Sequence, residues 1–116
     1  MIKSRKDLLE FWEEQMKLSH TSSNYFFRKS PSHYHMMLIV MHAYKYEENL
    51  SVEELKTKLF KTSRPKSALM IKEACDKNFF ILEKKGKDNR KKYVIPTPAF
   101  VGEFNDYLKT LKNLSF

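Results

Sequence analysis

Residues 51–98 read SVEELKTKLFKTSRPKSALMIKEACDKNFFILEKKGKDNRKKYVIPTP. At the start of this segment, the Ser51 hydroxyl can accept a hydrogen bond from the amide of Glu54, and the Glu54 carboxylate can reach back to the Ser51 amide. This arrangement, a capping box, marks the beginning of a helix. It predicts a short helix over residues 52–60.

A second helix is predicted after a turn at residues 61–63. Ser63 or Thr62 is the expected N-cap, and Pro65 falls in the first helical turn, where a missing amide proton costs little. We expect this helix over residues 64–77, because Asn78 tolerates the left-handed conformation in which many helices end. Two helices joined by a tight turn form a helix-turn-helix unit.

A β-hairpin is predicted directly after the second helix. The run FFILEKK, which begins at residue 79, is rich in aromatic and β-branched side chains and favours a strand. Residues 86–89 form the turn, and KKYVIP at 91–96 is the returning strand. The tip of the hairpin, KKGKDNRKK at 84–92, contains six basic residues among nine. A basic hairpin in this position is typical of a wing.

Outward from this segment, further helices are expected on the N-terminal side. Residues 4–18 have amphipathic spacing, with Ser4 as the expected N-cap. A polar break follows at 19–24, and residues 25–29 are apolar without a clear periodicity.

The remaining two helices are marked by proline after a capping residue. Ser30 followed by proline predicts a helix over 31–46, whose apolar residues lie on all sides and indicate a central buried helix. Thr97 followed by proline predicts a final helix over 98–114 with an apolar stripe.

The expected fold class is therefore mainly α with a small β-hairpin, a winged helix-turn-helix with N- and C-terminal flanking helices. The 116 residues fit a single winged-helix domain, 1–116. Within it we expect an N-terminal helix and linker at 1–24, the winged helix-turn-helix core at 31–97 and a C-terminal helix at 98–116.

Residues 34–98 resemble the DNA-binding core of the MarR family of bacterial and archaeal transcription regulators. That family's wing carries Asp-x-Arg followed by basic residues, and then a strand that ends in a Leu-Thr-Pro-like sequence. DNRK at 88–91 and IPTP at 95–98 stand in the matching places. The resemblance implies a DNA-binding, dimeric regulator. The chain departs from the family at Asn78, where glycine is usual, and in its short C-terminal helix.

The distribution of charge also indicates a polyanion as partner. The formal net charge is +8, and residues 61–92 alone hold 11 basic and four acidic residues, a net charge of +7. A solvated basic face is the ordinary alternative. Concentration inside a folded segment favours double-stranded DNA as the partner.

Helix 64–77 is the predicted reading element. Its N-terminal half would enter a major groove, with Arg64 or Lys66 on guanine, Leu69 against a thymine methyl and Lys72 on phosphate. The alternatives are an ordinary solvated face, and a core position for Leu69 in a shifted register. The predicted DNA contacts on this helix and its turn are Ser63, Arg64, Lys66, Ser67, Leu69 and Lys72.

The wing, residues 84–92, is the second predicted contact. Arg90 would enter a minor groove, where A·T-rich sequence deepens the negative potential. Asp88 would brace Arg90 or cap the turn. The alternative is a lysine-rich hairpin that keeps a sheet edge soluble. The predicted DNA contacts on the wing are Lys85, Lys87, Arg90, Lys91 and Lys92.

The flanking helices carry more large apolar side chains than a small core needs, which predicts a homodimer. The predicted interface residues are Leu8, Trp12, Met16, Phe104, Leu108 and Leu111.

No enzyme, cofactor or metal is expected. The sequence has no phosphate-binding loop and no nucleophile motif, and its histidines at 33, 35 and 42 lack a zinc-ligand pattern. Cys75, the single cysteine, is expected to be a small core residue rather than a redox sensor. Glu53 and Glu54 are interpreted as solvated charges.

The expected location is the cytoplasm, in association with the nucleoid. A single cysteine excludes an intrachain disulfide, no apolar run is long enough to span a membrane, and the N-terminus lacks a signal peptide.

A second function remains open at this point. A winged helix can be a protein-interaction module that binds, for example, RNA polymerase or another regulator, with only non-specific DNA affinity. Leu69 and YFF at 25–27 would then form the binding surface.

Overall fold

The computed structural model describes residues 7–19, 21–86 and 90–114. Within these ranges the chain forms six helices and one antiparallel pair of strands, which confirms the expected fold class. The elements are α1 (Leu8–Met16), α2 (Ser23–Phe27), α3 (Pro31–Lys45), α4 (Val52–Lys58), α5 (Arg64–Asp76), β1 (Phe80–Lys84), β2 (Lys92–Pro96) and α6 (Pro98–Lys112).

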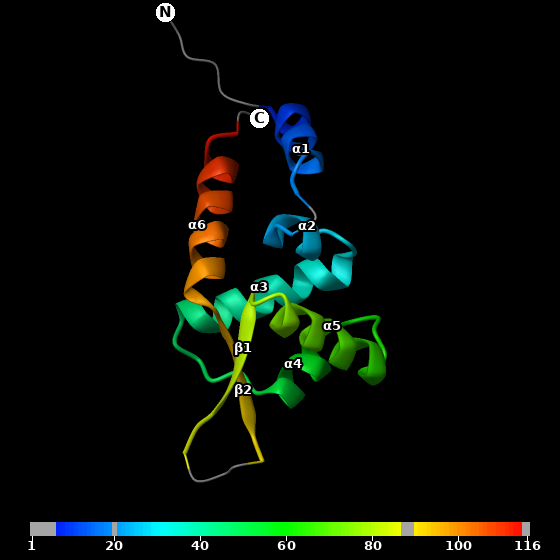
Figure 1. The fold of residues 1–116 in the computed structure, drawn as a ribbon, viewed down its shortest axis with the longest axis vertical. Helices are drawn as coiled ribbons and strands as arrows, with labels where there is room; N and C mark the ends of the chain where they lie inside the picture. The colour runs from blue at the N-terminus through cyan, green and yellow to red at the C-terminus, as the bar shows by residue number, and fades with distance from the viewer. Residues whose placement is uncertain (1–6, 20, 87–89, 115–116) are drawn as a thin grey trace, which may run out of the picture.

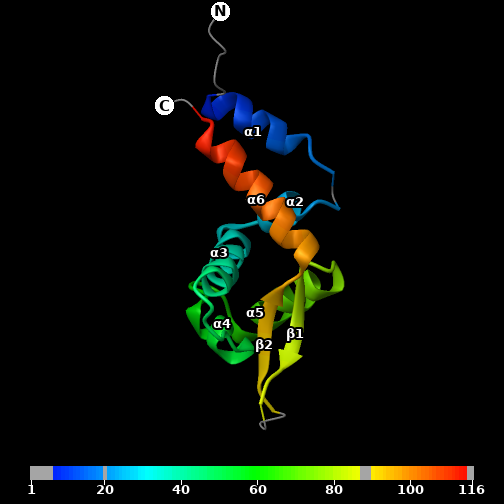
Figure 2. The ribbon, with the colours of Figure 1, turned by 90° about the vertical axis from the view of Figure 1, so that its left-hand side faces the viewer.

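The elements are arranged along one long axis. In Figure 1, α1 and α6 lie at the end that carries both chain termini, and the hairpin points to the opposite end. Helices α3, α4 and α5 lie between these two ends of the molecule. Figure 2 shows α1 beside the C-terminal end of α6. The long dimension of 60 Å, against 27 and 23 Å across, reflects this separation of the flanking helices from the wing.

Four of the predicted helix starts are confirmed. The side chains of Ser30, Ser51, Ser63 and Thr97 each accept a hydrogen bond from the amide three residues further on, at 3.1 to 3.2 Å. The capping box is complete, because the Ser51 amide also donates to Glu54 Oε1 at 3.3 Å. Local capping chemistry therefore sets most of the helix boundaries.

The prediction for the first helix was wrong at its start. The N-cap is Asp7, whose carboxylate accepts from the Glu10 amide at 2.9 Å, and the helix covers Leu8–Met16 rather than 4–18. Aspartate caps a helix as well as serine does, so the later cap is sufficient to begin it. Ser4 itself lies outside the described residues.

A short helix, α2, begins at the end of the predicted polar break (19–24) and continues into the apolar residues that follow it. Ser22 caps α2, and the amide and hydroxyl of Ser23 donate to Glu103 Oε1 at 3.2 and 2.6 Å. Phe26 and Phe27 follow, and both are buried. One helical turn is too short to be stable alone, so these contacts with the rest of the chain hold it.

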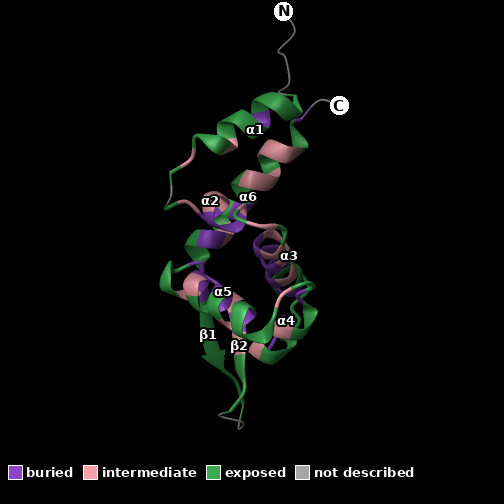
Figure 3. Cartoon of the chain, turned by 90° about the vertical axis from the view of Figure 1, so that its right-hand side faces the viewer, coloured by how far each residue is buried: buried purple, intermediate pink, exposed green. Residues whose placement is uncertain are grey.

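Aromatic rings form the centre of the core. Phe27 contacts the rings of Phe26, Phe80 and Phe100, with centroids 4.9 to 5.5 Å apart. This cluster joins α2, the hairpin and α6, and Figure 3 shows the buried faces of the helices turned toward it. Helix α3 contributes Met36, Met37 and Val40 to the core.

Helix α3 is not buried on all sides as its composition predicted. Leu38 is 43% exposed and Tyr44 is 50% exposed, while the opposite side of the helix is buried. With only six helices and one hairpin in the described residues, the other elements cover a single side of α3.

The hairpin forms where the sequence predicted two strands. Phe80 pairs with Pro96 and Lys84 with Lys92. The Val94 amide also donates to the carbonyl of Leu50 at 2.8 Å, so β2 is attached to the segment before α4. Gly86 has a φ of +69°, the left-handed conformation that a glycine adopts without strain.

Candidate nucleic-acid interface

The first half of α5 presents an exposed face of mixed basic and apolar character. Arg64, Lys66 and Leu69 are all exposed, and Leu69 is exposed by 56%. Met70, Ile71 and Ala74 face the core from the opposite side. This arrangement confirms the predicted helical register and excludes a core position for Leu69.

The prediction for Ser67 was wrong. Its side chain is fully buried and donates to the Ser63 carbonyl at 3.0 Å, and its hydroxyl lies 2.6 Å from that of Thr62. Ser67 therefore fixes the first turn of α5 against the preceding loop, and its side chain is not available to DNA. A small polar residue near a helix start does not reveal from the sequence whether it faces outward or back to the backbone.

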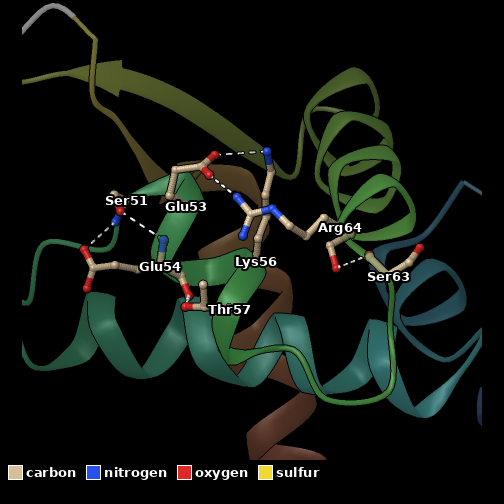
Figure 4. A network of polar contacts seen from close by, with 8 residues as sticks. Ser51, Glu53, Glu54, Lys56, Thr57, Ser63 and Arg64 are labelled. Carbon is tan, nitrogen blue, oxygen red and sulfur yellow. Dashed lines mark hydrogen bonds and ion pairs between the residues drawn. The ribbon is translucent and has the colours of Figure 1, made fainter.

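Two basic side chains of the face are held by acidic partners. Arg64 pairs with Glu53, the second residue of α4, as Figure 4 shows. Lys72 donates to Asp76 one turn further along α5 at 2.8 Å, and this bond raises the pKa of Lys72. Lys66 is exposed at the third helical position, and its amide donates to the Ser63 hydroxyl. The cations of this face therefore differ in how firmly they are oriented.

The wing extends the basic surface beyond α5. Lys85, Arg90, Lys91 and Lys92 are exposed. Lys85 is oriented by a 3.1 Å hydrogen bond to Asn49 Oδ1 and by the ring of Tyr93, 5.7 Å from the ammonium. The predicted contact at Lys87 and the predicted brace at Asp88 lie outside the described residues.

A compact junction fixes the wing relative to α5. Asn78 has a φ of +66°, as its position after the helix predicted, and the Phe79 amide bonds back to Ala74 at 2.9 Å. The buried hydroxyl of Thr97 donates to the Asn78 carbonyl at 2.9 Å and accepts from the Phe100 amide at 3.2 Å. One side chain thus joins the end of α5 to the start of α6.

Glu53 is a residue that the sequence analysis missed as part of this surface. Its carboxylate contacts Lys56 as well as Arg64. The spacing of three between Glu53 and Lys56 could have revealed the first contact, because residues three apart adjoin on a helix. Nothing in the spacing of Glu53 and Arg64 reveals the second, which depends on how α4 and α5 cross.

The other chemically reactive side chains lie away from this face or pack inside. Cys75 is half-buried against the core, and burial raises the pKa of its thiol. His35 stacks on Phe60 with centroids 5.3 Å apart, and His42 lies 3.9 Å from Glu48. Among the residues that the structure describes, no three histidine, cysteine or acidic side chains gather as metal ligands would.

The predicted dimer residues divide into three groups by burial. Leu8, Trp12 and Met16 lie on α1 and are 48 to 59% exposed, whereas Phe11 of the same helix is buried. Phe104 was wrongly assigned to a partner surface, because it packs in the core of its own chain next to Phe100. Leu108 and Leu111 are half-buried. Among the predicted dimer residues, the exposed apolar side chains therefore lie on α1.

None of the helices in the described ranges combines the length and the apolar character needed to cross a membrane.

Two solved structures of a similar protein share this arrangement. The heme sensor protein PefR, in complex with heme and carbon monoxide, superposes with a TM-score of 0.60 at 17% identity, over 89% of this chain and 62% of that chain. PefR from Streptococcus agalactiae in complex with heme gives a TM-score of 0.59 at 16% identity, over the same shares. This chain thus spans less than two thirds of the length of either structure, and the likeness shows the fold alone.

No family model matches the chain, and no curated protein does.

Proposed function

We propose that this chain is a sequence-specific, double-stranded DNA-binding transcription regulator of the MarR type, without enzymatic activity, that acts as a homodimer. Helix α5 lies in a major groove, and the wing follows the flanking minor groove. The observation that carries this proposal is one surface: the exposed start of α5 and the basic hairpin, joined rigidly through Asn78 and Thr97.

The chemistry of this surface suits DNA in two ways. Exposed lysine and arginine on the wing can neutralise phosphates, which gives affinity without sequence preference. Arg64 and Lys66 with Leu69 supply a donor set and an apolar contact for base edges at the start of α5. The likeness to a sensor protein of the same fold supports a regulatory role.

The experiment is a selection of bound duplexes from random DNA, followed by gel shifts over a range of salt concentrations. We expect a palindromic motif with half-sites about one helical turn apart. Lys91→Ala should weaken binding to all duplexes equally and lower the salt slope by about one. Arg64→Ala or Lys66→Ala should relax the preference at one position. Equal affinity of the unmodified chain for every duplex would exclude sequence-specific binding.

The second candidate is a protein-interaction module with non-specific DNA affinity, and the exposure of Leu69 is the observation in its favour. One of its two expected surfaces is lost, since Phe26 and Phe27 are buried in the core. DNA binding that vanishes above about 0.1 M salt, together with a protein captured tightly through Leu69, would favour this candidate.

A further inference from the structure

The carboxylate of Glu53 lies between Arg64, an exposed cation of the proposed DNA-binding surface, and Lys56, whose side chain is only 19% exposed. Glu53 Oε2 accepts a hydrogen bond from Lys56 Nζ at 3.1 Å, and Glu53 Oε1 pairs with Nη2 of Arg64. Lys56 is one turn further along α4, and Arg64 is the first residue of α5. Figure 4 shows both cations turned toward the same carboxylate. A single side chain therefore connects the first helix of the unit to the start of the reading helix.

Glu53 remains ionised in this position. The hydrogen bond from Lys56, followed by the charges of Lys56 and Arg64, holds its pKa below the ordinary value of 4.5. The Glu53 side chain is 65% exposed and the Arg64 side chain is 61% exposed. A DNA duplex can therefore reach both side chains.

A carboxylate in this place affects the two kinds of DNA contact differently. A phosphate that approaches Arg64 must compete with the carboxylate that already pairs with it, and the phosphate is itself repelled by that negative charge. A guanine edge is neutral, so the carboxylate does not repel it. It binds the planar guanidinium in one orientation, and a carboxylate paired with one side of the guanidinium provides that orientation.

We propose that Glu53 is a specificity-determining residue: it orients Arg64 toward a base edge and withholds Arg64 from phosphates, so that it weakens sequence-independent binding. This inference rests on the proposed function, and it concerns the balance between two affinities rather than the existence of binding.

The test uses the full chain and two duplexes, the motif selected from random DNA and a scrambled sequence of the same composition. Glu53→Gln keeps the shape of the side chain and removes its charge. We expect affinity for the scrambled duplex to rise, with a salt slope steeper by about one, because the exposed Arg64 becomes available to a phosphate. The ratio of the two affinities should fall about tenfold, within the range of one base contact.

Glu13→Gln is the matched control, since it makes the same change in net charge on exposed α1, at the far end from the wing. It should change both affinities by the same factor and leave the ratio intact. Thermal unfolding of both variants should match that of the unmodified chain, because an exposed ion pair contributes little to stability.

A second background identifies the route of the effect. In Arg64→Gln chains, adding Glu53→Gln should leave the ratio unchanged, since the group to be oriented is absent. A further fall in that background would show that Glu53 does not act through Arg64.

The two proposals fail differently. If the unmodified chain binds both duplexes equally, the proposed function is wrong. If it discriminates between them and Glu53→Gln behaves as Glu13→Gln does, the proposed function stands and the role of Glu53 is wrong.

Discussion

His33 begins the buried side of α3, with its ring edge-on to Phe26 at 5.2 Å and its Nδ1 2.7 Å from the Ser30 hydroxyl. Burial, and then the charge of Lys29, lowers its pKa from the ordinary value of 6.5. The folded chain therefore holds this imidazole neutral at pH values where the unfolded chain already binds a proton. Such a difference links folding to pH.

The sign of the effect follows from which state binds more protons. Below pH 6.5 the unfolded chain gains a proton at His33 first, so the free energy of unfolding decreases as the pH falls. We expect denaturant unfolding at about pH 5.5 to give a lower free energy than at about pH 7.5. His33→Gln should lose part of this dependence.

His42 provides the comparison, because its side chain is 64% exposed on the same helix. His42→Gln should keep the pH dependence of the unmodified chain. Equal dependence in the His33→Gln and unmodified chains would show that another group is responsible.

At the scale of elements, the turn between α5 and β1 rests on one residue in the left-handed conformation. Asn78 has a φ of +66°, and its carbonyl accepts from Thr97. Asn78→Ala should lower the free energy of unfolding by about 1 kcal/mol, because alanine is strained in the left-handed conformation, which glycine and asparagine tolerate. Asn78→Gly should unfold with nearly unchanged free energy. Denaturant unfolding measures both.

Lys77→Ala is the control for this turn, since Lys77 is exposed and has an ordinary φ of −85°. It should leave stability nearly unchanged. A loss in the Asn78→Gly chain as large as in Asn78→Ala would mean that the asparagine side chain, rather than its backbone, stabilises the turn.

The elements that could be predicted from the sequence are those with local signals. Ser30, Ser51, Ser63 and Thr97 each mark a helix start by the chemistry of the residue itself. Helix α2 could not be predicted, because contacts with distant parts of the chain stabilise it. Phe26 and Phe27 are buried in the core, and Ser23 bonds to Glu103. Local chemistry fixes where helices begin, and tertiary contacts decide where a single turn survives.

Only part of the candidate surface could be predicted from the sequence. Periodicity placed Lys66, Leu69 and Lys72 on the exposed side of α5, because burial of one helix face is a property of the local pattern. The burial of Ser67 and the pairing of Arg64 with Glu53 depend on neighbours that are not adjacent in sequence. Neither contact has a signature within one turn of helix.

At the scale of the whole molecule, the exposed apolar face of α1 and the basic surface of α5 and the wing lie at opposite ends. Helix α1 exposes Leu8, Trp12 and Met16 near the termini, while the wing and the start of α5 hold the basic residues. A second copy that covered α1 would leave the basic end of each chain open. This separation favours a dimer that binds one duplex with both copies.

We expect sedimentation at micromolar concentration to give about twice the 13.9 kDa mass of one chain. Replacing Leu8 and Met16 together by glutamate should give the single-chain mass, because two buried charges without partners would oppose association. Leu69→Glu is the matched control, as Leu69 has similar exposure, 56%, on α5. It should remain a dimer and lose DNA affinity. A 13.9 kDa species alone, in the unmodified chain, would exclude the dimer.

Thr97 has a consequence at this largest scale. Its hydroxyl bonds to Asn78, two residues after the end of α5, and to Phe100 in the first turn of α6, so one side chain restrains the two helices relative to each other. In the proposed dimer, joined through α1, the angle between α5 and α6 at Thr97 would set the distance between the two copies of α5. That distance would in turn set the spacing of the half-sites that the dimer can bind. Thr97→Val, which removes both hydrogen bonds, would then widen the range of tolerated spacings while leaving each half-site preference intact.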